Sequence, residues 1–104
     1  MTDLLDRISA LLGASTRDLG EIERTLTDGY AQALALEAER WRLEGQVARL
    51  SEEIEDGDLA VNVRELAGVA KRLGQNGRDL AALRSVLAEL RRSADDARAG
   101  SPSR

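Results

Sequence analysis

The sequence of 104 residues contains no cysteine, no histidine and no phenylalanine, and its one proline is Pro102. Without cysteine and histidine, the chain has no means to form a disulfide, a zinc-thiolate site, a thiol nucleophile or an imidazole base. Because a proline breaks a helix by removing a backbone donor, nothing of this kind interrupts residues 1–100. We therefore expect a helical protein that is not an enzyme and has no metal site and no cofactor.

The chain also lacks an excess of basic charge. Its 15 lysines and arginines are outnumbered by 19 aspartates and glutamates, which gives a formal net charge of −4. A duplex-binding protein needs a basic surface that neutralises phosphates, so we expect no nucleic-acid partner. No segment approaches the roughly 20 apolar residues that cross a bilayer, and the first residues lack the basic start of a secretory signal. These features predict a soluble, cytoplasmic protein that does not bind membranes.

What the sequence does contain is typical of amphipathic helices. Its hydrophobic residues make up 42% and are nearly all leucine, alanine and valine, whereas the charged residues make up 33%. At the N-terminus the apolar residues recur with the spacing that forms one stripe on a helix, and Gly13 follows as a helix stop. The sequence therefore predicts a short amphipathic helix over residues 1–13, with its apolar stripe at Leu4, Leu5, Ile8, Leu11 and Leu12.

A longer periodic segment follows, for which Ser15, Thr16 and Asp18 are candidate N-terminal caps. With Leu19 taken as heptad position a, nine of the eleven a and d positions up to Ile54 are apolar. Such a pattern is the signature of a helix that packs along its length against another helix. The a positions are Leu19, Leu26, Ala33, Arg40, Val47 and Ile54, and the d positions are Ile22, Gly29, Leu36, Leu43 and Leu50.

After Ile54 the heptad register is broken and a second one begins. Between the two registers lies Gly57, which tolerates a left-handed backbone conformation, and Asp58 can cap the helix that follows. This arrangement predicts a turn near residues 56–58. The new a positions are Leu59, Leu66, Leu73, Leu80 and Leu87, and the new d positions are Asn62, Val69, Asn76, Leu83 and Leu90.

The two registers together predict an all-α fold, in which residues 15–98 form an antiparallel coiled-coil hairpin and residues 99–104 a disordered tail. One alternative is a three-helix arrangement with a break at the turn-like residues 74–77. A second open point is Arg40, which either lies opposite Asn76 inside the hairpin or reaches solvent. The leucines expected to form the hairpin core, between its two helices, are Leu43, Leu50, Leu66, Leu73, Leu80 and Leu87.

Tyr30, Leu34 and Trp41 form a second apolar stripe on the first long helix, which its partner helix cannot cover. Exposed stripes that contain a tryptophan tend to mark interfaces, so we expect Trp41 to anchor a partner. The alternative is a lone surface tryptophan whose ring lies on charged side chains. We expect the hairpin to dimerise into a helical bundle and to act as a scaffold, an adaptor or a small subunit, with itself and another protein as partners.

An alternative function rests on the acidic turn, where Glu52, Glu53, Glu55, Asp56 and Asp58 gather. The run Gly57-Asp58-Leu59, with Asn62 three residues further on, resembles the coiled-coil tip of the Gre transcript-cleavage factors. The resemblance implies a hairpin that enters the secondary channel of RNA polymerase, with the first of the family's two tip acids at Asp58. Val61, which cannot bind a metal, stands at the second. The alternative is therefore a regulator that presents Asp56 and Asp58 to RNA polymerase or another enzyme.

Overall fold

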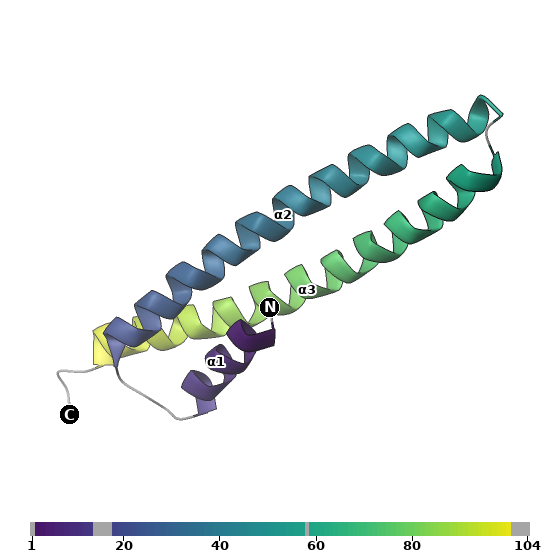
Figure 1. Ribbon diagram of the computed structural model, residues 1–104. Coiled ribbons are helices and arrows are strands. Elements are labelled where there is room, and N and C mark those ends of the chain that lie inside the picture. Colours follow the sequence, from purple (N-terminus) through teal and green to yellow (C-terminus); the bar gives the residue numbers. More distant parts are fainter. Residues whose placement is uncertain (1, 14–17, 58, 101–104) are drawn as a thin grey trace. The chain divides into compact units, whose positions relative to one another are not determined.

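The computed structural model describes residues 2–13, 18–57 and 59–100, and these residues form three helices (Figure 1). Helix α1 spans Thr2–Gly13, α2 spans Leu19–Glu55 and α3 spans Leu59–Gly100. No strand occurs within the described ranges. The predicted all-α class, with one short helix followed by two long ones, is confirmed.

Helix α2 begins at a side-chain cap. The backbone N–H of Glu21 donates to Oδ1 of Asp18 at 3.2 Å, and the N–H of Ile22 donates to the Asp18 carbonyl oxygen at 3.0 Å. These bonds satisfy donors that have no partner within the first turn of a helix. Asp18 thus acts as the cap, whereas Ser15 and Thr16, the other two candidates, lie outside the described residues.

The end of α2 depends on Gly57. The N–H of Asp56 donates to the Glu52 carbonyl oxygen, and the N–H of Gly57 donates to that of Ile54, each at 3.1 Å. Gly57 itself has a φ of +103°, a conformation that L-residues with a Cβ rarely adopt. The helix therefore stops at Glu55 because a glycine takes up the left-handed conformation two residues later.

Helix α3 is continuous through residues 74–77, so the three-helix alternative with a break at that cluster does not occur. The helix also extends further than the sequence analysis expected. Ala94 and Ala97 are buried, and residues 99 and 100, assigned there to the disordered tail, belong to the helix. The rest of that tail, residues 101–104, lies outside the described residues.

The chain divides into two compact units, which are described one at a time. The first unit comprises the residues up to Leu34 together with those from Ala81 onward, and the second comprises Ala35–Leu80. Helix α1 therefore belongs to the first unit, and the turn at Gly57 belongs to the second. Each unit contains one stretch of α2 and one of α3.

The second unit has its apolar core between α2 and α3. Three buried side chains form it, and three half-buried ones pack against them: Leu43, Leu50 and Val69, with Val47, Leu66 and Leu73. Fully burying a leucine stabilises a fold by roughly 1.5–3 kcal/mol relative to leaving it exposed. Four of the leucines predicted for the hairpin core thus meet in one cluster, and Leu80 is buried in the same unit.

A polar contact accompanies this core. Asn76, which is 3% exposed, donates from Nδ2 to the Leu36 carbonyl oxygen at 2.9 Å and to Oε1 of Glu39 at 3.1 Å. Arg40 does not lie opposite Asn76; its side chain is about half exposed and forms an ion pair with Glu44 at 3.4 Å. The arginine therefore reaches solvent, which was the second of the two possibilities considered for it.

The first unit has a core contributed by all three helices. Ile8 of α1 is fully buried, and Arg7 of the same helix forms an ion pair with Asp28 of α2 at 2.6 Å. Leu87, the last of the leucines predicted for the hairpin core, is buried here. The other buried side chains of α2 and α3 in this unit are Ile22, Thr25, Leu26, Leu83, Leu90, Ala94 and Ala97.

Gly29 allows the backbone of α2 to approach Leu87 closely within the first unit. A Cβ built at Gly29 would overlap Cδ2 of Leu87 and lie 3.3 Å from its Cγ. Alanine improves helix propensity over glycine by roughly 1 kcal/mol, but overpacking a core typically costs about 1–3 kcal/mol. We therefore expect Gly29→Ala to lower the free energy of unfolding by up to about 2 kcal/mol, as measured by urea denaturation.

The matched control for this substitution is Gly68→Ala. Gly68 is an exposed glycine within α3, and a Cβ there would have nothing within 4 Å. Its replacement should therefore raise the free energy of unfolding by about 1 kcal/mol. If both substitutions stabilise the protein equally, the close approach of Gly29 to Leu87 is refuted.

Candidate functional site

The structure exposes four large hydrophobic side chains among the residues it describes. Trp41 is 79% exposed, Leu34 67%, Val63 51% and Tyr30 42%. Leu34 and Tyr30 belong to the first unit, and Trp41 and Val63 to the second. The stripe predicted from the sequence thus consists of exposed residues, and Val63 is an addition that the heptad pattern did not single out.

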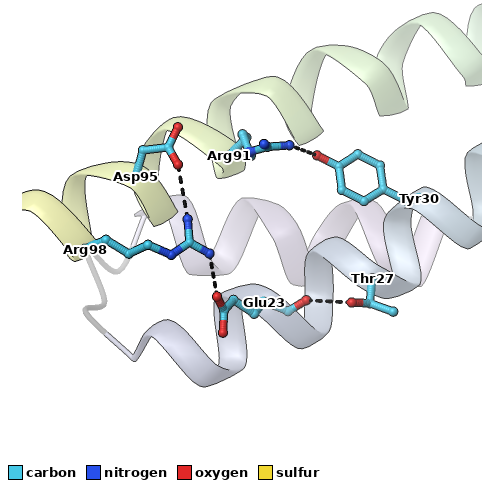
Figure 2. Close-up of polar contacts among 6 residues, drawn as sticks. All are labelled: Glu23, Thr27, Tyr30, Arg91, Asp95 and Arg98. Atoms are coloured by element: carbon cyan, nitrogen blue, oxygen red, sulfur yellow. Dashed lines mark hydrogen bonds and ion pairs between the residues drawn. The ribbon is translucent and has the colours of Figure 1, made fainter.

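Tyr30 differs from the other two residues of that stripe because its hydroxyl group contacts α3. Nη1 of Arg91 donates a hydrogen bond to the Tyr30 hydroxyl oxygen at 3.1 Å (Figure 2). This bond raises the pKa of the Arg91 guanidinium above its ordinary value. The hydroxyl group of Tyr30 thus has a partner on α3, while 42% of the residue remains exposed.

Arg98 links the two long helices near the same place. Its Nη2 contacts Oε2 of Glu23 on α2 at 2.5 Å, and its Nη1 contacts Oδ1 of Asp95 at 3.2 Å (Figure 2). These side chains are about half exposed, and exposed ion pairs of this kind contribute roughly 0–1 kcal/mol. The bridge between Arg98 and Glu23 was not predicted, because it joins two residues that are 75 positions apart in the chain.

An open groove of about 340 Å³ in the first unit is lined by Glu23, Leu26, Thr27, Tyr30, Arg91 and Arg98. The Thr27 hydroxyl donates to the Glu23 carbonyl oxygen at 3.0 Å, as Figure 2 shows, so its proton is engaged by the backbone. Both arginines of the groove have hydrogen-bond partners within the unit. The groove therefore contains contacts that join α2 to α3, and its charged lining residues are one glutamate and two arginines.

The acidic turn is described only in part. Glu55 and Asp56 are exposed, whereas Asp58, on which the alternative function depends, lies outside the described residues. Among the residues that the structure does describe, no three acidic side chains lie close enough together to hold a metal ion. Asp56 thus lies at the surface, and it belongs to no such acidic group among the residues that are described.

Comparisons with protein-family models, with curated proteins and with solved structures find no match. Within the described ranges, no helix has both the length and the apolar character that a membrane span requires. The interpretation of the surface therefore depends on its own residues. Of these, the exposed Trp41 is the largest apolar side chain that the fold leaves without cover.

Proposed function

We propose that this chain is a non-enzymatic interaction module. Its two long helices would pair as an antiparallel coiled-coil hairpin, which self-associates into a helical bundle and serves as a scaffold, an adaptor or a small subunit of a larger assembly. The observation that carries the proposal is the exposure of Trp41, 79% of which is accessible to solvent.

The burial of heptad positions supports the hairpin part of this proposal. On α2, Leu36, Leu43 and Leu50 recur every seven residues and are all buried. Buried residues with the same spacing occur on α3, and a heptad repeat of this kind is how paired helices keep one face toward each other. The buried series on α3 is Asn62, Val69, Asn76, Leu83, Leu90 and Ala97.

The exposed apolar residues support the interaction part. Tryptophan is enriched among the residues that dominate binding energies at protein interfaces, because its large ring removes much apolar area from water. Trp41 lies on α2 within the second unit, where the neighbouring core leaves its side chain in solvent. A second protein surface that covered this ring would therefore remove a large apolar area from water.

Trp41→Ala tests this proposal. We expect the variant to keep the helical circular dichroism of the parent, because Trp41 is on the surface and alanine favours helix. We also expect it to lower the molar mass measured by light scattering, because the interface loses its anchor.

The control for this experiment is Val63→Ala, which also shortens an exposed apolar side chain of the second unit and should leave the mass unchanged. A wild-type chain that is monomeric at every concentration would contradict the proposed self-association. A Trp41→Ala variant with the same molar mass as the parent would contradict the proposed role of Trp41.

A further inference from the structure

The outer face of α2 in the second unit, composed of Ala38, Trp41, Gly45 and Ala48, is exposed along its length. These residues are spaced by three, four and three positions, which places them on one side of a helix. Trp41 and the buried Leu43 are two residues apart and so point about 160° apart around the helix axis. This outer face is therefore turned away from the core of its own unit.

Small residues surround Trp41 on the outer face. Ala38 precedes it by three positions and Gly45 follows it by four, and a Cβ added at Gly45 would have nothing within 4 Å. A glycine inside a helix costs roughly 1 kcal/mol relative to alanine, and within the described ranges no close contact requires a glycine at this position. A small residue on each side of a large ring leaves room for the ring of a second copy to lie against this surface.

The charges that flank the outer face are segregated. Glu37 and Glu44 lie along one side of it, whereas Arg42 and Arg49 lie along the other, and all four are exposed. Along α2, Glu44 forms an ion pair with Arg40 at 3.4 Å, and Arg49 forms one with Glu53 at 3.9 Å. Because such exposed pairs between residues four apart are weak, they do not prevent stronger pairing with another surface.

The side on which each charge lies determines which alignment of two copies is attractive. The outer face has a heptad register of its own, separate from that of the buried face. With Ala38 and Gly45 at position a of this register, the two glutamates occupy position g and the two arginines occupy position e. In a parallel pair of helices, a g residue faces the e residue five positions later in the partner, and such pairs set orientation. Glu37 would then face Arg42 of the second copy, and Glu44 would face Arg49. In an antiparallel pair, positions of the same kind face each other, so that glutamate would meet glutamate and arginine would meet arginine.

We propose that the outer face binds a second copy of this chain, with the two α2 helices parallel and in register. Each Trp41 ring would lie against Ala38 and Gly45 of the other copy, and Glu37–Arg42 and Glu44–Arg49 ion pairs would form on both sides of a two-fold axis. This inference rests on the proposed self-association and specifies its surface and its orientation.

The first test compares Gly45→Lys with Gly68→Lys. Both positions are exposed glycines with open space for a side chain, so both variants should fold with unchanged helicity. Gly45→Lys would place a charged side chain where the Trp41 ring of the second copy would lie, and we expect it to weaken dimerisation at least about 100-fold in sedimentation equilibrium. Gly68→Lys, with the same change of net charge, should dimerise as the wild type does. Equal effects of the two substitutions would overturn the proposed surface.

The second test exchanges the flanking charges. The double variant Glu37→Arg/Glu44→Arg and the double variant Arg42→Glu/Arg49→Glu should each be monomeric where the wild type is a dimer, because like charges then face each other. Mixed in equal amounts, they should form a heterodimer, because the opposite charges are restored.

The outcomes separate this inference from the proposed function. A mixture that stays monomeric would overturn the pairing of the flanking charges, and double variants that remain dimeric by themselves would overturn the choice of surface together with its parallel alignment. If the double variants remain dimeric, the chain still self-associates, but not through the outer face as proposed. A wild-type chain that never dimerises would refute both.

Discussion

Replacement of Leu83 by alanine is expected to lower the free energy of unfolding by about 2–5 kcal/mol. Leu83 belongs to the first unit and is 0% exposed, one of the largest side chains that the described residues bury completely. Its truncation removes apolar contact and leaves a cavity that the surrounding helices can only partly fill. The change should appear in chemical denaturation followed by circular dichroism at 222 nm.

The control is Leu34→Ala, the same substitution in the same unit. Leu34 is 67% exposed, so its truncation should change the free energy of unfolding by less than about 0.5 kcal/mol. Both variants should be measured at one low protein concentration, because association adds to apparent stability. If the two substitutions cost the same, Leu83 is not in the core described here.

The sequence predicted the helices well because helix ends depend on local chemistry. Asp18 caps α2, and Gly57 ends it through a positive φ, and both signals are visible in single residues. The end of α3 was less predictable, because the charged residues after Leu90 suggest fraying. What keeps this end helical is the burial of Ala94 and Ala97, which depends on packing within the first unit.

The rotation of α3 about its own axis, which decides which of its residues face the core, was harder to predict from the sequence. The leucine series pointed to Leu66 and Leu73 as core residues, yet both are only half-buried. Val69 and Asn76 lie one turn from them and are 4% and 3% exposed. The heptad pattern placed Asn76 at a d position, but residue type alone favours leucine over asparagine inside a core, and the pattern did not identify the Leu36 carbonyl oxygen as the partner of Asn76.

The candidate site was predictable to the extent that it depends on a single helix. Trp41 and Leu34 stand out because they fall off the buried face of α2, and the structure leaves both exposed. The contact of Tyr30 with Arg91 could not be predicted, because it joins positions on two helices whose relative stagger the sequence does not specify. The exposure of Val63 was missed for a similar reason, since it depends on how α3 is rotated.

Replacement of Asn62 by leucine should raise the free energy of unfolding, by about 1–3 kcal/mol. Asn62 is 6% exposed, and its Nδ2 has no hydrogen-bond partner among the described residues. Burying a donor without a partner carries the cost of removing it from water, and leucine replaces it with apolar atoms at a position that already favours them. The increase should be measured by urea denaturation at fixed protein concentration.

The matched control is Asn76→Leu, two heptads further along α3. Asn76 also has an unpartnered atom, Oδ1, but its Nδ2 donates to the Leu36 carbonyl oxygen and to the Glu39 carboxylate. Hydrogen bonds to charged groups contribute roughly 1.5–3 kcal/mol, so this substitution should gain little or destabilise the fold. A gain as large as that of Asn62→Leu would contradict the contacts of Asn76. The two asparagines therefore differ in their effect. Asn62 lowers the free energy of unfolding at a core position, whereas Asn76 specifies which turn of α2 lies beside it.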